Sequence, residues 1–140
     1  MSASDYAGEV SSAEAYERLG GGNNAVLLDV RTRPEWQFVG VPDLRGIGKQ
    51  TLFLSWQEYP DMAVRDDFVE AVRAEGIAAN QDIYVICRSG ARSRSAAIAL
   101  TAAGFTAWNV SDGFEGPLDN GGHRGRESGW KAAGLPWVQQ

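Results

Sequence analysis

The stretch that decides the fold is IYVICRSGARSRS, residues 83–95. Its apolar first part, together with Asp82, is typical of a strand that is covered on both faces of a parallel sheet. A short polar loop follows, and the alanine-rich segment 95–103, which stops at Gly104, predicts a helix. Ligands of open α/β sheets bind at the carboxyl ends of the strands. The stretch therefore predicts a buried strand with a candidate site where the strand ends.

The rest of the chain alternates the same two patterns. Apolar runs at 25–30, 51–54 and 107–110 predict further strands. Helices are predicted over 13–19, capped by Ser11 or Ser12, and over 62–75, with a short helical turn over 34–38. Alternating strands and helices indicate an α/β fold with a parallel sheet.

Length and charge narrow the possible functions. The 140 residues suit one domain spanning the whole chain, 1–140. The net charge of -5 argues against nucleic acid or an anionic membrane as the partner, since phosphates need clustered cations. The acidic N-terminus does not resemble a signal peptide, and no apolar run approaches the roughly 20 residues that cross a bilayer. We expect a soluble protein of the cytoplasm.

Cys87 is the single cysteine of the chain, which excludes an internal disulfide, a four-thiolate zinc site and a CxxC redox pair. A lone cysteine in a strand is commonly an inert small apolar residue. Here, however, the window 88–94 holds three arginines and no acid, and a glycine and a helix start follow the cysteine. Backbone N–H groups of such a loop can form a nest for an anion, and the same groups favour a thiolate. Ser93 or Ser95 would cap the helix.

A second feature is the glycine-rich segment 113–129, which has six glycines and one proline and predicts a long loop. It could form a wall beside the site, where His123, Arg124 and Arg126 would add positive charge. The simpler interpretation is that His123 is a solvated loop residue.

Three separated motifs in this order resemble the rhodanese-like sulfurtransferases over about residues 5–137. In chain order they are the segment LDVR at 28–31 with Pro34, Glu35, Trp36 and Phe38, the loop CRSGARS at 87–93, and the ending GWKAAGLP at 129–136. The resemblance implies a three-layer α/β/α fold around a central, mainly parallel five-stranded sheet. It also implies structural support of the site by Asp29, Arg31 and Glu35.

The activity that the resemblance implies is transfer of a sulfane sulfur through a Cys87 persulfide, without metal or cofactor. The donor would be thiosulfate or another persulfide, and the acceptor cyanide, a low-molecular-weight thiol or a thioredoxin-like protein. Arg88 and Arg92 would bind the anionic donor, and Ser93 would cap the helix behind the loop. The residues whose amides would form the sulfur cradle are Arg88, Ser89, Gly90, Ala91 and Arg92.

One position departs from the family, and two other functions stay open. After the short helical turn the family often has Gly-His-Ile-Pro-Gly-Ala, and this chain has GVPDL at 40–44, so that Val41 replaces the histidine. Cysteine-dependent phosphatases and arsenate reductases place five residues between the cysteine and an oxyanion-binding arginine. Counting from Cys87 puts Ser93 at that position. The third interpretation is a module that relays persulfide between partner proteins.

Overall fold

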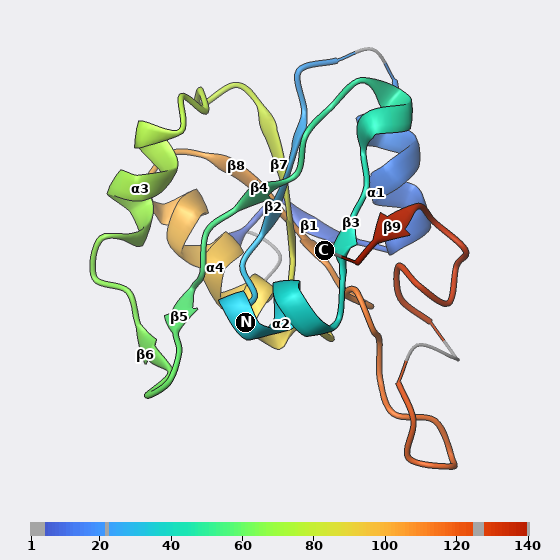
Figure 1. Cartoon of the computed structure of the whole chain (residues 1–140). Helices are drawn as coiled ribbons and strands as arrows, with labels where there is room; N and C mark the ends of the chain where they lie inside the picture. Colours follow the sequence, from blue (N-terminus) through green and yellow to red (C-terminus); the bar gives the residue numbers. More distant parts are fainter. Residues whose placement is uncertain (1–4, 22, 125–127, 140) are drawn as a thin grey trace.

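The computed structural model describes residues 5–21, 23–124 and 128–139 (Figure 1). Its centre is a five-stranded sheet in which every neighbouring pair is parallel. In spatial order the strands are β1 (Gly8–Val10), β8 (Thr106–Val110), β7 (Asp82–Ile86), β2 (Val26–Asp29) and β4 (Leu52–Phe53). The predicted α/β class and parallel sheet are confirmed, and the predicted strand 82–86 is the middle one.

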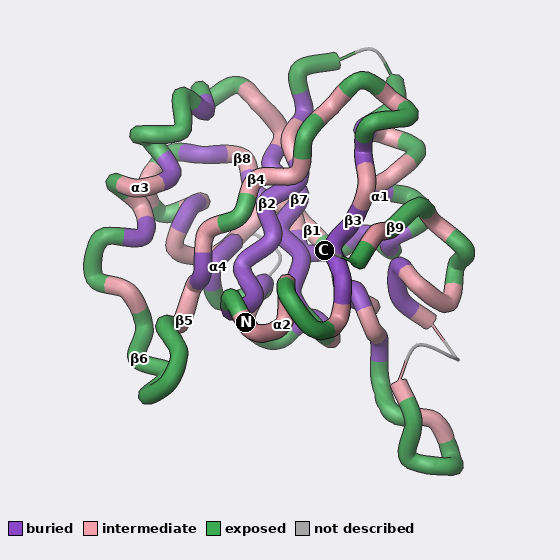
Figure 2. The backbone as a smooth tube through the Cα atoms, in the orientation of Figure 1, coloured by how far each residue is buried: buried purple, intermediate pink, exposed green. Residues whose placement is uncertain are grey.

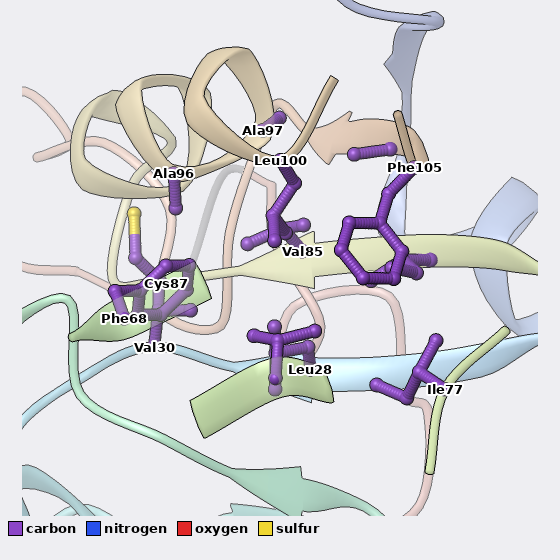
Figure 3. Close-up of a cluster of buried hydrophobic side chains, with 13 residues drawn as sticks. Leu28, Val30, Phe68, Ile77, Val85, Cys87, Ala96, Ala97, Leu100 and Phe105 are labelled. Carbon is purple, nitrogen blue, oxygen red and sulfur yellow. The ribbon is translucent and has the colours of Figure 1, made fainter. Parts of the chain in front are cut away.

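Helices cover both faces of this sheet (Figure 1). On one face, α1 (Ser12–Leu19) packs Ala15 and Leu19 into an apolar cluster that also holds Tyr84 and Ile86 of β7. On the other face, α3 (Phe68–Ala74) and α4 (Ala91–Ala102) cover the cluster that contains Val85. Alternate residues of β7 thus point to opposite cores. Figure 2 shows the central strands mostly buried, and Figure 3 shows the second cluster at close range.

Short elements complete the fold around the sheet. The helix α2 (Arg33–Phe38) follows β2 and begins with a capping box between Thr32 and Glu35. Two small antiparallel pairs join β3 (Val41–Pro42) to β9 (Trp137–Val138), and β5 (Gln57–Glu58) to β6 (Ala63–Val64). A 3-10 turn, η2, spans Arg45–Ile47.

Several boundaries differ from the sequence prediction. The helix expected over 62–75 begins only at Phe68, because residues 63–64 pair with residues 57–58 in a hairpin. The helix expected over 95–103 begins four residues earlier, at Ala91. The edge strand β1 was not predicted, because three residues of mixed polarity carry no periodic signal. Among the described residues of segment 113–129 there is no helix or strand, as expected for a loop.

No helix in the described part of the chain is long and apolar enough to span a membrane.

Candidate functional site

Cys87 lies immediately after β7, at the carboxyl end of the middle strand of the sheet. Its side chain is 1 % exposed, and Figure 3 shows the sulfur directed toward α4. Two backbone N–H groups donate to Sγ, from Gly90 at 3.2 Å and from Ser93 at 3.3 Å. Both donors follow Cys87 within six residues, so the loop 88–92 folds back around the sulfur of Cys87.

The loop needs glycine at its centre. Gly90 has φ of 107° and is the N-terminal flanking residue of α4, and a Cβ there would collide with the carbonyl of Ser111. With this conformation, four other amides stay free of hydrogen bonds to any described residue. They are the N–H groups of Arg88, Ser89, Ala91 and Arg92. Unpaired amides next to the first turn of a twelve-residue helix can stabilise a negative charge.

Arg92 is held by an ion pair from α2. Its guanidinium donates to both carboxylate oxygens of Glu35, at 2.7 and 2.9 Å. Burial acts to raise the pKa of Glu35, but the hydrogen bonds and charge of Arg92 and the N–H and hydroxyl of Thr32 outweigh it and lower this pKa to about 2. Glu35 is therefore ionised at neutral pH and engages both terminal nitrogens of the arginine.

Arg88 differs from Arg92, because its side chain is exposed and forms no ion pair with a described residue. Its carbonyl accepts hydrogen bonds from the N–H groups of Glu115 and Gly116, at 3.0 and 3.1 Å. The carbonyl of Cys87 accepts from Phe114 at 2.8 Å. The glycine-rich segment thus anchors the backbone of the site loop and leaves the Arg88 guanidinium available.

A cleft of about 420 Å³ opens beside the loop. Its lining combines two arginines and two glutamates with apolar and amide side chains: Glu35, Val39, Gln57, Met62, Arg88, Arg92 and Glu115. Gln57, Met62 and Glu115 reach the site from the hairpin and from the glycine-rich segment. No motif in the sequence indicated that these three residues would line the cleft.

Asp29 and Arg31 form a fully buried ion pair at the end of β2. The two side chains meet at 2.7 Å, and Arg31 also donates to the carbonyl of Gly40 at 2.8 Å. The guanidinium carbon lies 4.3 Å from the ring centre of Phe114. The pair therefore connects the strand end to the segment after α2 and to the segment that anchors the site loop.

The expectation that Ser93 or Ser95 caps the helix is wrong. α4 already begins at Ala91, with Gly90 as the flanking residue and no side-chain cap. Ser93 lies within the first turn, where its hydroxyl is 3.1 Å from Sγ of Cys87 and donates to Oδ1 of Asn109 at 2.5 Å. Sequence reasoning missed Asn109, because an isolated asparagine in a strand carries no recognisable signal.

The two described basic residues of the glycine-rich segment, His123 and Arg124, do not line the cleft. His123 is exposed, and its ring nitrogen lies 3.8 Å from Asp119. Arg124 donates to the carbonyl of Gly116, and Arg126 lies outside the described residues. Val41, which occupies the position of the family histidine, is buried in β3 opposite Val138.

Comparison with known proteins identifies relatives along almost the full chain. The family model described as STR4 middle domain matches residues 7–140. An uncharacterised RP600 homolog of Rickettsia rickettsii is 42 % identical over 129 residues, which cover 91 % of this chain and 94 % of the relative. The chloroplastic rhodanese-like domain-containing protein 4 of Arabidopsis thaliana is 27 % identical, covering 94 % of this chain and 26 % of that protein.

Two solved structures extend the comparison. Rv0390 from M. tuberculosis superposes with a TM-score of 0.88 at 46 % identity, covering 96 % of this chain and 99 % of that one. The polysulfide-sulfur transferase homodimer from Wolinella succinogenes shares the fold, with a TM-score of 0.63 at 23 % identity over 97 % of this chain and 80 % of that one. The chain belongs to the STR4 middle-domain family and is a rhodanese-like protein.

Proposed function

We propose that this rhodanese-like protein is a sulfurtransferase that carries a sulfane sulfur as a persulfide on Cys87. The observation that supports this most directly is the loop around Sγ, with four amides that have no partner among the described residues. A persulfide places its negative charge on a second sulfur, one bond beyond Sγ. Preorganised N–H donors aimed at a developing charge are a strong source of catalysis.

With thiosulfate as donor, the ionised sulfur of Cys87 attacks the outer sulfur of the anion. A new S–S bond forms, the bond between the two thiosulfate sulfurs breaks, and sulfite leaves with the electron pair. The terminal sulfur of the persulfide keeps one negative charge and lies among the loop amides. Cyanide or a thiolate then attacks this sulfur, and Cys87 leaves as the thiolate. The cycle is balanced without a metal or redox cofactor.

The two loop arginines have different roles in this proposal. Arg88 is exposed and has no ionic partner among the described residues, so it is the side chain that would meet an anionic donor. Arg92 is engaged by Glu35 through both terminal nitrogens, so it acts mainly by holding the loop. The cleft lining carries two positive and two negative charges, which also suits an organic persulfide as donor.

The acceptors we propose are cyanide, a low-molecular-weight thiol or a thioredoxin-like protein. A relay of persulfide between proteins would use the same atom of Cys87. A reducing compartment such as the cytoplasm would keep this unpaired thiol available. For a phosphatase or arsenate reductase, the side chain at the oxyanion-binding position would be Ser93, which is uncharged and fully buried. We therefore favour sulfur transfer.

Intact-mass spectrometry tests the proposal. Because the chain has one cysteine, a mass increase of one sulfur atom after incubation with thiosulfate reports on one site. The added mass should disappear with dithiothreitol, and the Cys87→Ser variant should never acquire it. A glutathione persulfide incubation forms the second arm. Absence of added sulfur with both donors would contradict the proposal, as would release of phosphate from a chromogenic ester without thiocyanate formation from thiosulfate and cyanide.

A further inference from the structure

The cleft beside the site loop holds two opposite charges that do not pair with each other. Glu35 and Arg92 neutralise one another through hydrogen bonds of 2.7 and 2.9 Å. Arg88 and Glu115 line the same cleft, and neither forms an ion pair with a residue that the structure describes. The charges that the cleft offers to a ligand are therefore one guanidinium and one carboxylate.

The backbone holds these two residues next to each other. The N–H groups of Glu115 and Gly116 donate to the carbonyl of Arg88, at 3.0 and 3.1 Å. The N–H group of Phe114 donates to the carbonyl of Cys87 at 2.8 Å. Three consecutive N–H groups thus attach the segment with Glu115 to the start of the site loop. The two charged side chains arise from adjoining points of the backbone, close to Cys87.

The carboxylate of Glu115 lacks a donor within the described part of the chain. Lys131 is within electrostatic range of it, but the ammonium of Lys131 lies 4.0 Å from the centre of the Trp137 ring and forms no ion pair with Glu115. No described side chain donates a hydrogen bond to this carboxylate, which can only accept. An ammonium group of a ligand would supply the missing donor and the missing positive charge.

An α-amino acid carries the two complementary groups on a single carbon atom. Its carboxylate suits the guanidinium of Arg88, and its ammonium suits Glu115. Val39 and Met62 give the cleft an apolar part for the side chain of such a ligand. Thiosulfate, by contrast, has two negative charges and no positive one, so Glu115 repels it while Arg88 attracts it. The volume of about 420 Å³ is also within the range of pockets that bind small organic molecules.

We propose that Glu115 determines which sulfur donor the site prefers, and that this donor is the persulfide of an α-amino acid thiol, with its ammonium on Glu115 and its carboxylate on Arg88. The inference rests on the proposed function, because it names the substrate class of the same site. In the transfer step the ionised sulfur of Cys87 attacks the outer sulfur of R–S–SH. A new S–S bond forms, the S–S bond of the donor breaks, and the thiolate R–S⁻ leaves with the electron pair. The transferred sulfur keeps its hydrogen.

The first test measures binding without sulfur transfer. S-methylcysteine and 3-(methylthio)propionate are unreactive thioethers that differ only in the ammonium group. Titration of ¹⁵N-labelled protein, followed at the amide signals of Arg88 and Glu115, gives the dissociation constant of each. The wild type should bind S-methylcysteine about fivefold more tightly than the analogue without the ammonium, because only the former can form an ion pair with Glu115.

Three variants assign this preference to its residues. Glu115→Gln has nearly the same shape and should bind the two thioethers equally. Arg88→Ala should weaken both to the same extent, since both carry the carboxylate. Glu17→Gln removes one negative charge from an exposed position on α1, outside the cleft, and should keep the wild-type preference. Equal affinities in the wild type, or a preference that survives in Glu115→Gln, would overturn the inference.

The second test measures transfer, as the rate at which Cys87 gains one sulfur atom by intact mass. Glu115→Gln should raise the KM for cysteine persulfide and lower the KM for thiosulfate, because the lost charge attracts one donor and repels the other. A change of both KM values in the same direction would contradict the assignment of Glu115. If the protein gains no sulfur from any donor, the proposed function fails, and the thioether titration still decides whether the cleft recognises an amino acid.

Discussion

Replacing Glu35 by glutamine should remove much of the acid sensitivity of the protein. The pKa of Glu35 is about 2 in the folded chain, against 4.5 for the free group. A carboxyl with a lowered pKa contributes stability that is complete above its unfolded value and is lost as the pH falls through its folded value. The pH window of the effect is therefore between about 5 and 2.

The magnitude follows from that difference. At neutral pH the ion pair and hydrogen bonds of Glu35 correspond to about 3 kcal/mol of unfolding free energy, of which about 2 kcal/mol is lost by pH 3. Urea unfolding followed by tryptophan fluorescence at pH 7 and pH 3 measures the loss in the wild type and in Glu35→Gln. All other carboxyls titrate in both proteins, so the difference between the two losses isolates Glu35.

Glutamine is the matched substitution, because it still serves as the partner of Thr32 in the capping box of α2. A second control is Asp43→Asn. The pKa of Asp43 is also about 2, through its hydrogen bonds with Arg45, but this pair lies at the surface and should matter little for stability. Parallel losses in the wild type and in Glu35→Gln would refute the reasoning, since Glu35 would then contribute nothing to the acid dependence.

Three further predictions follow from the site and its support. Asp29→Asn should lower the unfolding free energy by about 3–5 kcal/mol in urea titrations, because it leaves the buried Arg31 without its counter-charge. Gly113→Ala should lower the melting temperature and slow persulfide formation, because the φ of Gly113 is 66° and a Cβ would collide with the Arg88 backbone. Gly122→Ala is the control, because Gly122 also has a positive φ, 78°, but open space around it, so it shows the effect of backbone strain without a collision. Arg88→Ala should raise the KM for thiosulfate about tenfold in a thiocyanate assay and leave the melting temperature unchanged, because this guanidinium is exposed.

The predictable parts of the fold are those with strong local signals. The apolar run of β7 and the cap and period of α1 are recognisable over a few residues, and both lie where they were expected. Elements that depend on a distant partner were missed or misplaced. β1 exists because it pairs with β8, which lies about a hundred residues away along the chain, and the start of α3 is displaced by the β5–β6 hairpin.

The same distinction holds within the candidate site. Cys87 and Gly90 lie close together in the chain, so a polar loop after the strand could be predicted from the order of residues alone, although the helix begins four residues earlier than expected. The roles of Ser93 and Arg92 could not. Ser93 is a hydrogen-bond partner of the sulfur instead of a cap, and Arg92 is engaged by Glu35, which lies 57 residues away.

By itself, the sequence determined the α/β class, the position of the reactive sulfur and the enclosing loop, because short-range sterics and apolar periodicity act between neighbours in the chain. Only the tertiary structure decided which loop arginine has no ion-pair partner among the described residues, that the cleft is balanced in charge, and that the Ser93 hydroxyl beside the sulfur donates to Asn109. These properties depend on distances between side chains of different elements. Parallel strands bring such side chains together at one edge of the sheet, and the direction of a hydrogen bond is settled only when every partner in the chain of bonds is in place.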